Sequence, residues 1–197
     1  MSGTFTEARH ACFAVVDFET TGAVEGYSVE PWQIGVVRVR EGQVCAGESF
    51  ESLMHVGDRP FNPRAPGRHA QLRGQLAQAP APGELWPELA RWLTGVPLVA
   101  HNAGTERTML NKLAPLHRLG PWIDTLTLVR RAYPGLVSKA LEEVVAALGL
   151  AGRVQALCPG RAAHDALYDA FACAAVMEHF LRLPGWERVT VEALSGK

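Results

Sequence analysis

Two acidic side chains near the start of the chain have the spacing of a metal site. Asp17 and Glu19 follow an apolar run at 13–16, and a turn-forming Thr-Thr-Gly comes directly after them. On a strand, residues two apart point to the same side, with their Cα atoms about 6.5–7 Å apart. Two carboxylates this close repel each other unless a cation neutralises them. The pattern therefore indicates a divalent cation at the end of a strand.

A histidine and an aspartate near the C-terminal end could join this site. Asp169 has Ala166 and Cys173 at i−3 and i+4, so it borders the apolar stripe of a helix, where an uncompensated carboxylate is costly. His164 lies five residues earlier. On a regular helix that separation is a rotation of about 140°. The two side chains can therefore meet only if His164 lies in the loop before the helix, and we place it there.

A further carboxylate, Glu106, lies in the first turn of the helix that follows the fourth predicted strand. Ligands of mixed α/β sheets bind at strand ends and helix starts, so one cleft can hold all these groups. Its members are Asp17, Glu19, Glu106, His164 and Asp169. Four carboxylates and one imidazole favour Mg²⁺ or Mn²⁺, since zinc would need more histidine or cysteine. Two such ions ~4 Å apart stabilise the attacking and leaving oxygens of a phosphodiester, and a neutral histidine can accept a proton from water.

The composition favours one soluble globular domain. The chain has 197 residues, 48% hydrophobic and 20% charged, and we expect a single domain over 1–197 with a core at about 11–183. Its apolar runs are too short to span a bilayer, and the first ten residues lack the apolar region of a signal peptide. We therefore expect a cytoplasmic protein without a membrane partner. The four cysteines form no Cys-x-x-Cys pair and are expected to be reduced.

The net charge of −1 argues against a protein that coats nucleic acid by bulk electrostatics. Segment 55–82 differs locally, since it carries four arginines, three of them Arg64, Arg68 and Arg73, against a single aspartate. Two interpretations stay open for this segment: a solvated, proline-rich loop and a surface that contacts phosphates.

The predicted elements are those of an α/β protein. Three strands form an antiparallel meander, and two further strands alternate with helices, which gives a mixed five-stranded sheet with helices on its faces. The predicted strands are 13–16, 33–39, 43–50, 97–100 and 122–123. The predicted helices are 84–93, 104–114, 125–132, 139–148 and 165–183. Asn102 and Ser138 are expected to cap two of these helices, and 59–82 is expected to be an ordered but irregular excursion.

Among the aromatic residues, Trp86 and Trp92 are expected to be buried, because each lies three residues from Leu89 on a helix. Phe18, Trp32 and Tyr27 lie nearer the first acidic motif and are candidates for base stacking. The role of His101 is ambiguous, so we leave it outside the catalytic set.

Three motifs together resemble those of the DEDDh 3′→5′ exonucleases, the family of the proofreading epsilon subunit of bacterial replicative polymerase. The motifs are Asp17-Phe18-Glu19-Thr20-Thr21-Gly22, Leu98-Val99-Ala100-His101-Asn102-Ala103-Gly104-Thr105-Glu106 and His164-Asp165-Ala166-Leu167-Tyr168-Asp169-Ala170. They occur in the family order, and the resemblance runs from about 13 to 181. It implies a ribonuclease H-like fold.

The resemblance also implies roles for single residues. Asp17, Glu19 and Asp169 hold two divalent cations, Mg²⁺ or Mn²⁺, and His164 is the general base. Glu106 stands where the family has aspartate and is a further metal ligand. The implied substrate-binding residues are Phe18, Thr20, Thr21 and Asn102.

We therefore expect a metal-dependent 3′→5′ exonuclease that releases nucleoside 5′-monophosphates from DNA, in proofreading or repair. Two alternatives stay open. One is an exoribonuclease of the oligoribonuclease or ribonuclease T type. The other is a catalytically weak nucleic-acid-binding module, because the extra methylene of Glu106 moves its carboxylate by roughly a bond length, and ~1 Å can matter in a catalytic site. The expected partners are single-stranded nucleic acid or 3′ ends and a DNA polymerase, and the sequence leaves the oligomeric state open.

Overall fold

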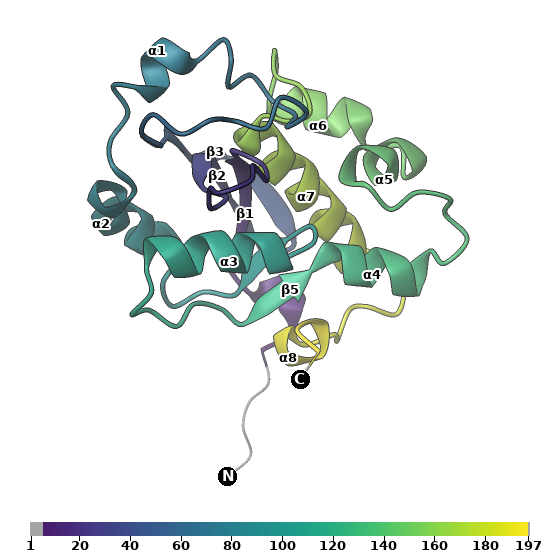
Figure 1. Cartoon of the computed structure of the whole chain (residues 1–197). Coiled ribbons are helices and arrows are strands. Elements are labelled where there is room, and N and C mark those ends of the chain that lie inside the picture. Colours follow the sequence, from purple (N-terminus) through teal and green to yellow (C-terminus); the bar gives the residue numbers. More distant parts are fainter. Residues whose placement is uncertain (1–5, 197) are drawn as a thin grey trace.

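Five strands form one mixed sheet in the computed structural model, which describes residues 6–196 (Figure 1). The sheet order is β3-β2-β1-β4-β5. β1 (Phe13–Thr20), β2 (Pro31–Arg40) and β3 (Gln43–Leu53) form the antiparallel meander, and β4 (Leu98–Ala100) and β5 (Trp122–Asp124) continue it in parallel with β1. The predicted mixed five-stranded sheet is confirmed.

The alternation of β1 assigns its two faces to two hydrophobic clusters. Phe13 and Val15 belong to a cluster formed with the C-terminal helices. Ala14 and Val16 belong to a second cluster, which contains residues of α2 and α3. Because side chains alternate along a strand, the next odd-numbered residues, Asp17 and Glu19, lie on the face of the first cluster.

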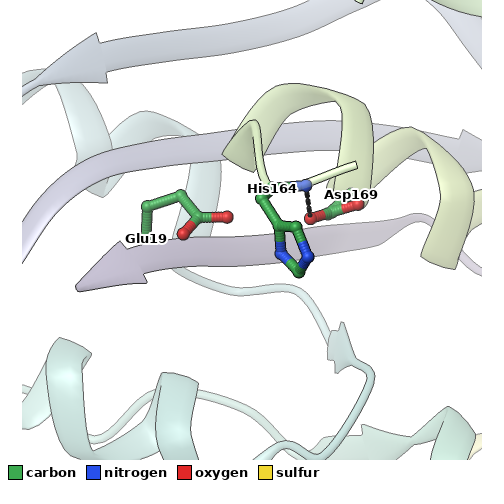
Figure 2. Close-up of side chains that lie close together, drawn as sticks. All are labelled: Glu19, His164 and Asp169. Atoms are coloured by element: carbon green, nitrogen blue, oxygen red, sulfur yellow. Dashed lines mark hydrogen bonds between the residues drawn. The ribbon is translucent and has the colours of Figure 1, made fainter. Parts of the chain in front are cut away.

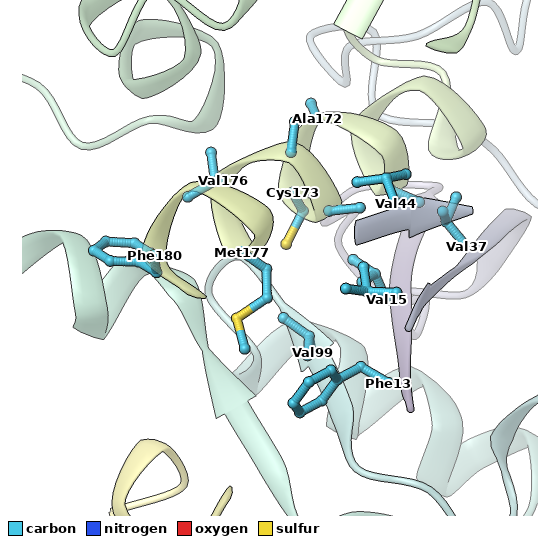
Figure 3. Close-up of a cluster of buried hydrophobic side chains, with 14 of the residues drawn as sticks. Phe13, Val15, Val37, Val44, Val99, Ala172, Cys173, Val176, Met177 and Phe180 are labelled. Carbon is cyan, nitrogen blue, oxygen red and sulfur yellow. The ribbon is translucent and has the colours of Figure 1, made fainter. Parts of the chain in front are cut away.

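Helix α7 (Ala166–Leu181) covers that face and is buried along most of its length. Figure 3 shows its side chains, including Cys173 and Met177, packed with side chains of the sheet. The contact is closest at Gly35 of β2, where an added Cβ would lie 2.2 Å from the carbonyl oxygen of Ala166. A glycine is needed there because the opposing atoms belong to the backbone of α7 and cannot turn aside.

Seven shorter helices and one 3-10 turn complete the structure of residues 6–196. α2 and α3 pack on the second cluster, whereas α4, α5, α6 and α8 contribute to the first. Their bounds are η1 Ala8–His10, α1 Arg73–Leu76, α2 Pro82–Leu93, α3 Gly104–Leu113, α4 Thr125–Ala132, α5 Leu141–Ala147, α6 Ala151–Leu157 and α8 Val191–Leu194. None of the helices in this part of the chain has the length and apolar character that a bilayer crossing needs.

Two predicted caps are wrong. Asn102 does not cap α3, because it adopts a left-handed conformation with φ +69° and its backbone N–H donates to Asp124 Oδ1 at 3.0 Å. Ala103 occupies the cap position. Ser138 likewise lies too early, since α5 begins at Leu141 and Ser138 Oγ accepts only from the N–H of Ala140, at 3.3 Å.

Helix α6 was not predicted from the sequence; it starts two residues after Gly149, the glycine that follows the preceding predicted helix. The excursion at 59–82 is largely irregular, as predicted, and contains the single turn α1. Trp86 and Trp92 are partly buried against the second cluster, in line with the prediction for them.

Candidate active site

The end of β1 carries the first two acidic residues. Asp17 pairs with Gly35 in the sheet, directly under the start of α7, and Glu19 is two residues further along the same face. The side chain of Glu19 is 7% exposed. The β1–β2 register shifts between Glu19 and Thr20, so regular pairing ends where the acidic motif ends.

The start of α7 brings in the histidine and the third carboxylate. Asp165 is the N-cap residue, and its carboxylate accepts the N–H of Tyr168 at 3.3 Å. His164 lies just before it with φ +65°, and its backbone N–H donates to Asp169 Oδ2 at 2.9 Å. The prediction that His164 lies in the loop before the helix is confirmed.

These residues converge on one point. One ligand atom from each of Glu19, His164 and Asp169 lies within 4.8 Å of the other two. Figure 2 shows Glu19 extending from β1 toward His164, with the hydrogen bond from His164 to Asp169 dashed. Asp17, His164 and Asp169 also line a common pocket of about 170 Å³. The structure therefore brings together four of the five predicted catalytic side chains.

The fifth, Glu106, lies in the first turn of α3. It is 4% exposed, and its Oε2 has no hydrogen-bond partner within residues 6–196. It lies outside the cluster of Glu19, His164 and Asp169, but its charge raises the pKa of Asp17. Glu106 therefore has no compensating group among these residues, which is costly for a buried carboxylate oxygen.

Burial disfavours the charged forms of all four carboxylates, and repulsion by neighbouring carboxylates adds to it. Burial is the main cause that raises the pKa of Glu19 to about 8, of Glu106 to about 8 and of Asp169 to about 6. The pKa of Asp17 is also well above its usual range, through burial first and then through the charges of Asp169, Glu106 and Glu19. An oxygen-rich donor set with this excess of negative charge fits hard divalent cations.

The predicted substrate-binding residues differ in their surroundings. Phe18 is 6% exposed and belongs to the second cluster, on the opposite face of the sheet from Glu19, so the prediction of base stacking by its ring is wrong. Thr21 is buried, and its Oγ1 accepts the N–H of Glu30 at 3.1 Å. Thr20 is partly exposed and Asn102 is exposed, so both side chains remain accessible beside the acidic motifs.

Trp32 is also excluded as a stacking platform. It is fully buried, and its indole N–H donates to the carbonyl oxygen of Thr20 at 3.1 Å. This hydrogen bond helps to hold the end of β1, next to the acidic motif. Tyr27, the remaining candidate, is about half exposed.

Two site features were not predicted. Asp165 is buried between Arg68 and Arg161, with N···O distances of 2.6 Å and 2.9 Å. His101, which lines the pocket of Asp17, joins Thr125 Oγ1 at 2.9 Å and the carbonyl oxygen of Lys139 at 2.7 Å. A carbonyl oxygen only accepts, so Nε2 of His101 carries the proton. The contacts of Arg68 and of His101 join distant segments, which no local sequence signal indicates, whereas Arg161 lies only four residues before Asp165 and is a local pair.

The basic segment 55–82 approaches the site from one side. An added Cβ at Gly67 would lie 3.3 Å from Glu19 Oε2 and 3.2 Å from the carbonyl oxygen of His164. Arg68 is engaged by Asp165, and Arg59 forms an ion pair with Glu30 at 3.2 Å. Two of the four arginines are therefore used inside the protein. Contact with phosphates stays a prediction for the other two, Arg64 and Arg73.

Comparison with known proteins gives a consistent result. Residues 14–177 match the RNase_T family model, which is described as an exonuclease. A DNA polymerase III subunit epsilon-like protein of Rhodobacter capsulatus is 32% identical over 174 residues, which cover 87% of this chain and 23% of that protein. Exodeoxyribonuclease 10 of Escherichia coli K12 is 27% identical over 188 residues, which cover 93% of this chain and 74% of that protein. The chain thus spans about a quarter of the length of the first relative and about three quarters of the second.

Solved structures agree with the sequence relatives. Exonuclease X in complex with 5′ overhanging duplex DNA has a TM-score of 0.70 and 26% identity, over 93% of this chain and 99% of that one. The nuclease domain of 3′hExo, a DEDDh family member bound to rAMP, has a TM-score of 0.71 over 94% and 98% of the two chains. The two chains are 16% identical, so this comparison shows a similar fold and nothing more. The predicted ribonuclease H-like α/β fold and the resemblance to DEDDh exonucleases are confirmed.

Proposed function

Because the chain belongs to the RNase_T exonuclease family, we propose that its site removes nucleoside 5′-monophosphates from the 3′ ends of DNA. The observation that carries the proposal is the convergence of Glu19, His164 and Asp169 within 4.8 Å, in a site shared with Asp17. Such a group of acidic side chains around one imidazole suits phosphodiester hydrolysis better than it suits structural support, since it is costly without cations.

The carboxylates would hold two divalent cations, Mg²⁺ or Mn²⁺. Asp17, Glu19 and Asp169 supply the principal oxygen ligands. The buried, unpartnered Oε2 of Glu106 supports this residue as a further ligand. Bound cations would neutralise the excess negative charge and stabilise the charge that develops on the phosphodiester.

His164 is the proposed general base. His164 is exposed to solvent, so its ring can reach an attacking water molecule. Its backbone is fixed by the hydrogen bond to Asp169. A neutral imidazole can accept the proton that the water loses. Thr20 and Asn102, both accessible beside the site, are the proposed contacts for the terminal nucleotide. For Thr21 and Phe18 the proposal concerns the backbone, because their side chains are buried.

DNA is the proposed substrate because of the names of the relatives. One is an exodeoxyribonuclease, and exonuclease X is described in complex with duplex DNA that has a 5′ overhang. The name of the Rhodobacter relative supports a DNA polymerase as a partner. For this chain, the DNA substrate and the polymerase partner are proposals.

The experiment compares DNA and RNA directly. Single-stranded oligonucleotides of one sequence, labelled at the 5′ end, are incubated with Mg²⁺ or Mn²⁺ and, as a control, with EDTA. The proposal expects stepwise shortening from the 3′ end with either metal, at least tenfold faster on DNA, and none with EDTA. Faster shortening of RNA would contradict the DNA assignment, and shortening in EDTA would contradict metal dependence.

A further inference from the structure

A second hollow lies along α3 and shares no lining residue with the pocket of Asp17. Its volume is about 470 Å³. Arg107 and Asn111 of α3 form one wall, and His117, Arg118 and Trp122 lie among the residues of the other. Arg107 and Asn111 are four residues apart, so they lie on the same face of the helix.

The charge of this hollow is positive only. None of the described residues that line it is acidic. Arg107 and Arg118 are both exposed, and neither forms a salt bridge with any residue in 6–196. Arg59 and Arg68 of the basic segment, in contrast, form ion pairs with carboxylates of the protein. In a chain with a net charge of −1, two uncompensated arginines in one hollow point to an anionic ligand.

The outer wall is held in place. The ring of His117 packs on Trp86 of α2, with ring centroids 4.4 Å apart. The backbone N–H of His117 also donates to the carbonyl oxygen of Ala114 at 3.0 Å, directly after α3. The hollow therefore has two fixed walls and does not depend on a loop closing over it.

The hollow is linked to the proposed active site through α3, and it extends from there toward the far end of that helix. Arg107 directly follows Glu106, and Pro115, another lining residue, comes just after the end of α3. From Arg107 to Leu113, the last residue of α3, the helix rises by about 9 Å. One strand of a duplex places a phosphate every ~3.4 Å along its axis, so this length accommodates more than one phosphate.

We propose that this hollow, the Arg107–Arg118 groove, binds the phosphate backbone of the substrate strand on the 5′ side of the nucleotide being removed. The inference rests on the proposed function, because it gives a role to the rest of the strand whose 3′ end enters the acidic site. Guanidinium groups suit this role, since they donate several hydrogen bonds in a planar arrangement that matches phosphate oxygens.

The test uses the double variant Arg107→Glu/Arg118→Glu and measures binding without turnover. Fluorescence anisotropy with a labelled single-stranded DNA of about 20 nucleotides, in EDTA, gives Kd as a function of salt. We expect at least tenfold weaker binding. With ~0.7 counterions released per contact on single strands, we expect the slope of log K against log salt to fall by about 1.4 for two contacts. The matched control Arg131→Glu/Arg188→Glu makes the same change of net charge on α4 and before α8, and should bind like the wild type.

The length of the substrate separates this inference from the proposed function. With Mg²⁺, the groove variant should show at least a tenfold higher KM on the long strand and less than a twofold change on a dinucleotide, whose single phosphodiester is the bond that lies in the acidic site. Unchanged Kd and salt slope, or an equal loss on both lengths, would overturn the groove. If the wild type cleaves neither substrate, the proposed function fails, and the anisotropy comparison still decides the groove.

Discussion

The backbone N–H of His164 donates a hydrogen bond to Oδ2 of Asp169 at 2.9 Å, across the first turn of α7. The bond is possible because His164 adopts φ +65°, which turns the chain back over the helix start. It occupies one lone pair of the carboxylate and fixes the histidine beside it. The hydrogen bond thus fixes the proposed metal ligand, Asp169, and the proposed general base, His164, relative to each other.

The first prediction concerns this histidine. His164→Ala should lower kcat by roughly 10²–10⁴-fold, because a general base is lost while the backbone hydrogen bond to Asp169 remains. Single-turnover hydrolysis of a DNA oligonucleotide measures the loss. Mn²⁺ affinity, determined by calorimetry, should change little. Full activity of the variant would exclude His164 as the base.

The second prediction concerns the contact between β2 and α7. Gly35→Ala should destabilise the fold by about 1–3 kcal/mol or more, because the new Cβ would meet the backbone of Ala166 at 2.2 Å. Gly47→Ala on β3 is the matched control, since nothing lies within 4 Å of a Cβ there. Urea unfolding compares the two. Equal stability of both variants would mean that α7 can move away freely, and would contradict the close contact.

The third prediction is a pH dependence of the metal-free protein. Folding raises the pKa of Glu19 from its ordinary 4.5 to about 8, so between these values the native state binds more protons than the unfolded state. This contribution to stability is complete below about pH 4.5 and is lost as the pH rises through 8. The metal-free wild type should therefore lose more stability between pH 5.5 and pH 8 than Glu19→Gln does.

Thermal unfolding in EDTA at the two pH values measures this difference. The variant is needed as the reference, because folding lowers the pKa of His101 and so contributes a dependence of opposite sign. Added Mg²⁺ should raise the Tm of the wild type more at pH 8 than at pH 5.5. Parallel pH profiles for wild type and Glu19→Gln would contradict the raised pKa.

The fourth prediction concerns the glutamate that replaces the family aspartate. Glu106→Asp should keep activity within about tenfold of the wild type, whereas Glu106→Ala should lose at least 10²-fold, because Oε2 is buried without a partner and is free to serve a cation. Initial rates with Mg²⁺ measure both. A large gain in Glu106→Asp over a nearly inactive wild type would support the catalytically weak module instead.

Local patterns in the sequence predicted the parts of the site that depend on local geometry. The period of two along β1 placed Asp17 and Glu19 on one face, and helical periodicity showed that His164 must precede α7. Both are properties of neighbouring residues. The mixed five-stranded sheet was predicted by the same reasoning, because a meander followed by alternating strands and helices is a local pattern, whereas the strand order was found only in the structure.

Some of the features that could not be predicted are contacts between distant segments. Arg68 forms a hydrogen bond with Asp165, 97 positions further along the chain. Asn102 does not cap α3, and its backbone N–H donates to the carboxylate of Asp124. In these two cases tertiary contacts override local propensity. Phe18 is different, because the alternation that places Asp17 and Glu19 on one face also places the ring of Phe18 on the other, so the pattern itself contained this outcome.

The most direct test of the account is hydrolysis of 5′-labelled single-stranded DNA by the wild type and by Asp17→Asn, side by side with Mg²⁺. Asp17 is the carboxylate on which the charges of Asp169, Glu106 and Glu19 all act, so its loss should disable cation binding most completely. The account predicts stepwise shortening from the 3′ end by the wild type and almost none by the variant. Equal shortening by both proteins would contradict the proposed active site.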